Sequence, residues 1–198
     1  MTPHGILADW EIAQLCGPND PMIQPTELRQ VRERKGVKCI SYGLSSHGYD
    51  VRLAGDIQIF TNLAAATIDP KNFVLQRTLT KAAVQYEDGS SFIVLPPHSY
   101  ALGHTREFFD IPRDIMVVCV GKSTYTRCGI HVNVTPIEAG FKGQVVIEIS
   151  NATPLPARIY LDEGIAQFLF FRGEPCDTSY ADRNGKYQNQ LGVQPAKV

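Results

Sequence analysis

The feature of this sequence that most restricts its fold is a succession of short apolar segments, each ended by glycine, proline or a polar turn. The segments lie at residues 49–60, where a Gly-Asp turn divides Val51 and Leu53 from Ile57 and Ile59, and at 91–105, 114–121, 144–150, 157–161 and 166–171. Each has the length and apolar pattern of a strand or a pair of strands. Many short strands joined by turns favour a sandwich, a jelly roll or a barrel over alternating strands and helices.

Helical signals are few and short. Asp9 is placed to cap a short helix through Cys16, and residues 27–36 could form a second helix. The second segment is charged nearly all round and has no apolar stripe, which is more typical of a solvated surface segment or a loop. Its role stays open. Residues from about 180 to 198 are expected to form a polar tail, and the whole chain, 1–198, a single mostly-β domain.

The composition argues against several classes of protein. The 198 residues include 19 Lys+Arg and 20 Asp+Glu, and the formal net charge of −1 is not the basic field that non-specific nucleic-acid binding requires. No apolar stretch approaches the length of about 18 residues that spans a membrane, and the N-terminal sequence lacks a signal-peptide pattern. We therefore expect a cytoplasmic protein with neither a nucleic-acid nor a membrane partner.

The cysteines and histidines do not follow a metal-binding pattern. The five cysteines are an odd number and include no Cys-x-x-Cys pair, so neither a disulfide framework nor a cysteine-rich zinc site is expected. Zinc deaminases need a His-x-Glu and a Pro-Cys-x-x-Cys motif to hold the metal. Here Cys176 follows Pro175, but Ser179 stands where the second cysteine would be, and no His-x-Glu occurs. No catalytic zinc is expected.

A polar segment follows directly on the apolar segment 114–121. Its Gly-Lys-Ser resembles the end of a P-loop, but Met116 stands where the first P-loop glycine would be, which excludes that phosphate-binding loop. Ser123 is a suitable N-cap and Gly129 a suitable stop, so one helical turn is predicted over residues 123–127. Lys122 and Arg127 beside this turn would suit a phosphate chain. The alternative is an ordinary strand-to-helix connection with a surface arginine.

The segment 144–150 places a single carboxylate in an apolar strand. On strand alternation, Val145, Ile147 and Ile149 share one face, while Val146 and Glu148 share the other. Partial burial makes a carboxylate a stronger base near neutral pH, so Glu148 is a candidate general base. The alternative is a glutamate on a solvated strand face.

Taken together, these segments resemble the dCTP deaminases, which share a superfamily with the trimeric dUTPases. The matching stretches are SYGLSSHGYDVRL, GKSTYTR, NVTPIEAGFKG, VVIEISN, GIAQFLF and SYADRNGKYQNQLGV, in this order from about residue 40 to 193. The resemblance implies a distorted β-barrel or jelly-roll subunit with a few short helices. It also implies a homotrimer with active sites between subunits, and Mg²⁺ bound through the nucleotide triphosphate with no zinc.

The reaction that the resemblance implies is hydrolytic removal of ammonia from C4 of the cytosine in dCTP. The product is dUTP, which feeds dUMP and dTTP synthesis. Glu148 matches the family's catalytic glutamate and would act as general base. Ser123 matches the serine that helps to position the attacking water, and Arg127 matches the arginine that stabilises charge developing on the base.

Further positions match the family's nucleotide-binding residues, and none is implied as a metal ligand. On the phosphate and base side these are Lys122, Ser123, Thr124, Tyr125, Thr126 and Arg127, with Val146 and Ile147 contacting the base through backbone groups. Gln167, Tyr180, Lys186 and Gln190 would close over the nucleotide, with residues 180–198 as a lid. Glu138 and Phe141 would flank the sugar or the base.

Two departures and three alternatives accompany this resemblance. Lys122-Ser123-Thr124 replaces the Arg-Ser-Ser of many relatives, and lysine cannot make the two-pronged phosphate contact of arginine. The loop 137–143 also varies between relatives. A bifunctional enzyme that continues to dUMP, a dUTPase, and a nucleotide-binding regulator without turnover all stay open. We expect dUTP and dTTP, which share the triphosphate, to be candidate inhibitors.

Overall fold

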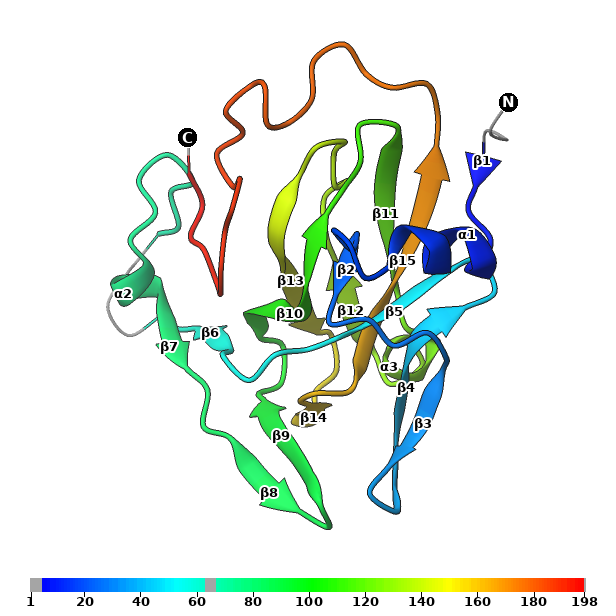
Figure 1. The fold of residues 1–198 in the computed structure, drawn as a ribbon. Helices are drawn as coiled ribbons and strands as arrows, with labels where there is room; N and C mark the ends of the chain where they lie inside the picture. The colour runs from blue at the N-terminus through cyan, green and yellow to red at the C-terminus, as the bar shows by residue number, and fades with distance from the viewer. Residues whose placement is uncertain (1–4, 63–66, 198) are drawn as a thin grey trace.

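The computed structural model describes residues 5–62 and 67–197, which fold into two large β-sheets and a small third sheet (Figure 1). The helices within this range are α1 (Asp9–Leu15), α2 (Leu75–Thr78) and α3 (Ser123–Thr126). Every segment predicted as a strand from its apolar pattern contains at least one. The predicted class, a mostly-β fold with a few short helices, is confirmed.

One large sheet is built around β15. Its strands are β1 (Gly5–Ile6), β3 (Val31–Arg34), β4 (Val37–Ser45), β5 (Gly48–Arg52), β11 (Ile115–Gly121) and β15 (Gly164–Arg172). The order is β1-β15-β5-β4-β3, and β11 pairs with β15 along Ile115–Gly121, on the edge opposite to β1 and β5. Because β11 leads directly into α3, this outer strand carries the predicted polar turn at its end.

The second large sheet contains the strand with the candidate base. Its strands are β2 (Ile23–Gln24), β6 (Gln58–Phe60), β7 (Leu79–Lys81), β10 (Tyr100–Asp110), β12 (Ile130–Asn133) and β13 (Lys142–Asn151), in the order β12-β13-β10-β6-β7 with β2 beside β10. The third sheet is β14 (Ala157–Tyr160), β9 (Ser90–Leu95) and β8 (Gln85–Glu87). In the described residues these sheets are open, so the barrel is distorted rather than closed.

Strand alternation builds an apolar core between the two large sheets. Val145, Ile147 and Ile149 of β13 are buried, as predicted, and β15 contributes Phe168 from the facing sheet. The rings of Phe168 and Phe109 of β10 have centroids 5.2 Å apart, so the inner faces of the two sheets meet. Burying large aromatic side chains supplies much of the stabilisation of such a core.

Two local segments differ from the sequence patterns for identifiable reasons. Residues 27–36, for which a solvated surface segment or loop is favoured over a helix, are mostly exposed, but they contain β3 and the turn of a β3–β4 hairpin, where Lys35 (φ 52°) and Gly36 (φ 81°) adopt the left-handed conformations of a tight turn. The α1 helix forms, but its N-cap is Ala8 rather than Asp9. The carboxylate of Glu11 accepts a hydrogen bond from the Ala8 N–H at 3.0 Å, which satisfies the helix end one residue earlier.

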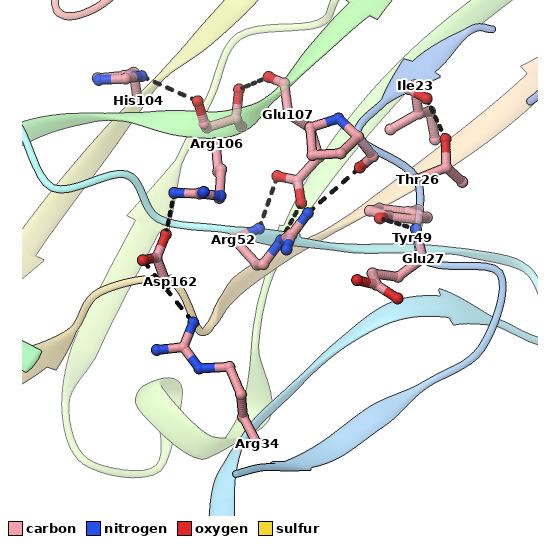
Figure 2. A network of polar contacts seen from close by, with 12 residues as sticks. Ile23, Thr26, Glu27, Arg34, Tyr49, Arg52, His104, Arg106, Glu107 and Asp162 are labelled. Atoms are coloured by element: carbon pink, nitrogen blue, oxygen red, sulfur yellow. Dashed lines mark hydrogen bonds and ion pairs between the residues drawn. The ribbon is translucent and has the colours of Figure 1, made fainter. Parts of the chain in front are cut away.

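A buried ion pair joins the two large sheets (Figure 2). The Nε of Arg52 in β5 lies 2.7 Å from Oε1 of Glu107 in β10, with side chains 9% and 0% exposed. The Arg52 backbone N–H donates to the other carboxylate oxygen at 3.0 Å, and its Nη2 donates to the Pro25 carbonyl at 3.4 Å. Burial raises the pKa of Glu107, against the opposing effect of Arg52 and the hydrogen bonds.

Removing one member of this pair should destabilise the fold more than removing both. Arg52→Met leaves a buried carboxylate without its cation, at an expected cost of about 3–5 kcal/mol, whereas adding Glu107→Leu should recover most of the loss. Equilibrium urea unfolding of the single and double variants measures the coupling. Arg106→Met removes the more exposed Arg106–Asp162 pair and should cost about 1 kcal/mol or less. If the losses in unfolding free energy of the two single variants simply add in the double variant, Arg52 and Glu107 are not coupled.

Candidate active site

The polar turn after β11 forms at the predicted place. α3 (Ser123–Thr126) is a single helical turn whose N-cap is Lys122 rather than Ser123. The helix ends at Thr126, and the turn that follows it closes at Gly129 (φ 73°), where an added Cβ would lie 2.4 Å from the Thr153 methyl group, so this position requires glycine.

The side chains of α3 divide between the core and the surface. Tyr125 is buried, and its hydroxyl accepts a hydrogen bond from the Tyr160 N–H at 2.8 Å, so this side chain anchors α3 to β14. Ser123, Thr124, Thr126 and Arg127 are exposed. Thr126 Oγ1 donates to the Lys122 carbonyl at 3.1 Å, whereas the Ser123 hydroxyl and the Arg127 guanidinium have no polar partner within the described residues.

The structure places the Lys122 side chain in a buried ion pair. Its Nζ lies 2.6 Å from Oδ2 of Asp50 in β5, with the two side chains 11% and 4% exposed. The Nε2 of Gln30 donates to the same oxygen at 3.0 Å. The sequence analysis missed Asp50, although an aspartate inside the apolar strand 49–53 signals a buried partner.

Gln167 lies next to this ion pair. On β15 it is opposite Asp50 on one side and Val120 on the other. Its Nε2 donates to Ser45 Oγ at 2.8 Å, which holds the amide at the corner where β11 turns into α3.

Glu148 occupies the outward face of β13, as predicted. It is half-buried, lies opposite Leu102 of β10 and Asn133 of β12, and its Oε2 accepts a hydrogen bond from Nδ2 of Asn133 at 2.8 Å. Burial and the Glu148 charge raise the pKa of Tyr100 to about 12 and that of Cys119 to about 12, so both lie within electrostatic reach. The sequence analysis also missed Asn133.

The C-terminal tail docks on the start of β13 (Figure 1). Gln190 pairs in parallel with Gly143, accepts the Gln144 N–H at 3.0 Å and donates to the Gln144 carbonyl at 2.7 Å. The Gln144 N–H is accepted by the backbone carbonyl of Gln190, whereas the side-chain amide oxygen, Oε1, is buried and has no partner in the described residues. Such an unsatisfied acceptor calls for a donor from outside the chain.

The other predicted residues of the tail lie close to this docking point. The rings of Tyr180 and Phe141 have centroids 5.9 Å apart, and the Tyr180 hydroxyl accepts the Tyr187 N–H at 2.9 Å. Glu138 forms an ion pair with Arg183. The exposed Lys186 donates to the Lys197 carbonyl at 2.5 Å.

The tail and β12 leave a gap along one edge of β13. The tail bonds at Gln144 and β12 pairs from Asn151 to Glu148, so in the described residues nothing pairs with Val146 on this edge. Alternate residues of an antiparallel strand direct their N–H and C=O to the same edge, which points those of Val146 into the gap. From residue 144 to 148 the gap is about 13 Å long at about 3.4 Å per residue. Ile147 is fully buried.

α3 packs against β12 and, through Thr124, borders a separate groove. The groove has a volume of ≈ 460 Å³ and is lined by Arg32, Lys38, Cys39, Ile40, Ser41, Ser90, Thr124, Tyr160 and Glu163. No hydrogen bond or ion pair joins Ser123 or Arg127 to Glu148 within the described residues. One chain thus holds the candidate base and the tail around one gap, but presents α3 elsewhere.

Other sites are not evident in the described part of the chain. Within residues 5–62 and 67–197, no three His, Cys, Asp or Glu side chains lie close enough together to bind a metal ion. The five cysteines are free, and no described helix is long and apolar enough to cross a membrane.

The fold is similar to that of a solved enzyme. A crystal structure of 2'-deoxycytidine 5'-triphosphate deaminase from Agrobacterium tumefaciens matches with a TM-score of 0.63 and 21% identity, over 86% of this chain and 49% of that chain. The present chain therefore spans about half the length of that one, and the likeness concerns the fold.

Sequence comparison extends this likeness to the family. A family model described as dCTP deaminase-like matches residues 6–173. A protein named dCTP deaminase from Gluconobacter oxydans is 57% identical over 189 residues, covering 95% of this chain and 96% of the relative. Another of that name, from Rickettsia bellii, is 52% identical over 176 residues, covering 88% and 90%. The chain belongs to the dCTP deaminase-like family, which confirms the resemblance.

Tail docking should depend on the glycine at position 185. A Cβ added to Gly185 would lie 2.2 Å from the Tyr180 ring, so Gly185→Ala must displace that ring and loosen residues 180–197. Hydrogen exchange of the Tyr187 amide, which Tyr180 holds, should increase by about tenfold or more. Gly173→Ala is the matched control, since nothing lies within 4 Å of its added Cβ. Equal protection in both variants would show that Gly185 does not support the tail.

Proposed function

We propose that this protein removes ammonia hydrolytically from C4 of the cytosine in dCTP and releases dUTP. The observation that carries the proposal is the gap in the β13 edge. It offers the backbone N–H and C=O of Val146 to the polar edge of a base, with the Glu148 carboxylate at one end. The names of the relatives support dCTP as the substrate.

In the proposed reaction Glu148 moves the protons. As a water oxygen bonds to C4, the carboxylate takes a proton from that water and delivers it to N3 of the ring. It then takes the remaining proton of the new hydroxyl group and delivers it to the exocyclic nitrogen. The C4–N bond breaks, ammonia leaves, and C4 becomes the carbonyl carbon of uracil. The Ser123 hydroxyl would orient the water, and Arg127 would stabilise charge on the ring.

The triphosphate would lie along α3. The exposed hydroxyls of Ser123 and Thr124 and the unpaired guanidinium of Arg127 suit phosphate oxygens. Lys122, paired with Asp50, would contribute to the phosphate side by holding the start of α3 in place rather than by direct charge. Mg²⁺ is a hard cation that takes oxygen ligands, and α3 offers cationic and hydroxyl groups rather than carboxylates. This donor set fits Mg²⁺ held by the phosphates.

Each active site would be assembled from two subunits of a homotrimer. Within the described residues of one chain, no hydrogen bond or ion pair joins α3 to Glu148, and a neighbouring copy could bring its α3 to the gap. A suitable contact surface is the outer face of β1, β11 and β15, where the apolar side chains are Ile6, Met116, Val118, Val120, Leu169 and Phe171, from half-buried to exposed. Exposed apolar faces of this kind mark contact surfaces. The face ends next to α3, so a subunit packed on it would border Ser123 and Arg127.

The tail would act as a lid over the nucleotide. Its Gln190 borders the gap, while its Tyr180 packs on Phe141 and its exposed Lys186 would serve a phosphate. Gln167 would act from the strand beside α3. Glu138 and Phe141 would flank the sugar. The Oε1 atom of Gln190, which has no partner in the described residues, would accept a hydrogen bond when nucleotide binds.

A product assay tests the reaction and the base together. With dCTP and Mg²⁺, the protein should release ammonia and dUTP in equal amounts, and Glu148→Gln should lower turnover by about 10² or more while dCTP still binds. Glu87→Gln makes the same substitution on the distant strand β8 and should leave turnover unchanged. Ammonia with dUMP and pyrophosphate would show a bifunctional enzyme, and cleavage of dUTP without ammonia would show a dUTPase. Near-normal turnover of Glu148→Gln would remove the proposed base.

Shared sites predict complementation between two inactive variants. Arg127→Met and Glu148→Gln place their defects on different subunits of each site. Random mixing should therefore restore roughly a quarter of the sites in a trimer. The variants would be mixed in denaturant, refolded and assayed against each alone. A site contained within one subunit would stay inactive in every mixture.

The contact surface has its own control. Val118→Asp, which charges the outer face of β11, should reduce the mass measured by light scattering to that of a monomer. Leu155→Asp alters an apolar side chain that is 68% exposed away from this face and should leave the mass unchanged.

A further inference from the structure

We infer that Asn133 is a positioning residue for Glu148, holding one carboxylate oxygen so that the other faces the water to be activated. The inference rests on the proposed role of Glu148 as the base. Asn133 is the last residue of β12 and lies directly opposite Glu148 in the ladder. Its Nδ2 donates to Oε2 at 2.8 Å, while Oε1 has no hydrogen-bond partner in the described chain.

The chemistry of an amide suits this role. An asparagine side chain donates two hydrogens and does not titrate, so it holds a carboxylate without competing for its proton. The reverse orientation would turn the amide oxygen toward a carboxylate oxygen, which is repulsive, so the donor must face Glu148.

The position at the end of a strand adds a geometric argument. Asn133 is held in register by the β12–β13 ladder, whereas the chain after it leaves β13 and opens the gap at Val146. Asn133 therefore lies where the β12–β13 pairing ends and the gap at Val146 begins. It is exposed, so its side chain is not required to fill the core.

The other groups that face Glu148 do not supply this contact. Tyr100 of β10 and Cys119 of β11 have pKa values raised to about 12, mainly by burial, so both are neutral near physiological pH. His104, on the same face of β10, bonds to the Thr105 carbonyl at 3.0 Å, and burial lowers its pKa. His131 lies on the same face of β12, opposite Ser150 rather than Glu148. From a neighbouring subunit, Arg127 would approach under the proposed function.

Two substitutions at position 133 separate positioning from a structural role. Asn133→Ala should lower kcat by about tenfold with KM changed less than about twofold, because the lost contact is to the base and not to the substrate. Asn133→Asp places a second carboxylate beside Glu148, and two adjacent carboxylates cannot both ionise readily. The acidic limb of the pH profile of kcat/KM should therefore shift upward by about one pH unit or more. Thermal unfolding should be nearly unchanged in both.

His131→Asp is the matched control for the aspartate variant. It adds the same charge two residues away on the same strand face, about 7 Å from position 133. We expect its acidic limb to move much less than that of Asn133→Asp. Equal shifts in the two variants would show a general field effect, and this would overturn the inference.

Other outcomes distinguish this inference from the proposed function. If Asn133→Ala raises KM with normal kcat, Asn133 binds substrate and does not position the base. If both Asn133 variants behave as the wild type while Glu148→Gln is inactive, the inference fails and the proposed base stands. If Glu148→Gln is itself active, the base assignment fails first.

Discussion

The ion pair between Arg52 and Glu107 is the constraint on which the arrangement of the two large sheets depends. It crosses from β5 to β10 in a region that excludes water, and the Arg52 guanidinium also lies 4.9 Å from the centre of the Tyr42 ring. Two buried charges tolerate little displacement, because a lost contact leaves an ion without compensation. β10 is in turn the neighbour of β13, so the pair helps to set the frame in which Glu148 is presented.

The candidate site lies where one edge of β13 is only partly paired. β13 is paired along one edge by β10, but along the other edge the tail and β12 leave Val146 without a partner among residues 5–62 and 67–197. Unpaired backbone groups are costly when buried, and a flat heterocycle with donors and acceptors on its edge can satisfy them. Under the proposed function, the same sheet that builds the core would recognise the base at Val146 and supply a carboxylate two residues further along. Neither α3 nor the tail would then need to rearrange the sheet to complete the site.

The sequence predicted what depends on local pattern. Alternation along residues 144–150 located the buried Val145, Ile147 and Ile149 and the outward Glu148, and the turn signals around Ser123 and Gly129 located α3. The β3–β4 hairpin was not predicted, because its charged strands bury neither face well and the sequence therefore shows no alternation of apolar and polar residues. Asp50 and Asn133 were not predicted as site residues for another reason. Lys122 and Asp50 are 72 positions apart, and Asn133 meets Glu148 only through the register of a ladder, neither of which residue spacing reveals.

The pairing of Lys122 with Asp50 has a consequence for the form in which a nucleotide can be recognised. Because these two charges cancel inside the protein, α3 and its C-cap offer a ligand, within the described residues, the single unpaired cation of Arg127 against the several negative charges of a triphosphate chain. Even with the exposed Lys186 of the tail beside a phosphate, two cations would neutralise a bare triphosphate only in part. Under the proposed function the protein would discriminate by net charge, favouring the metal-complexed nucleotide over the free one. Its occupancy in a cell would then follow the supply of free magnesium as well as that of nucleotide.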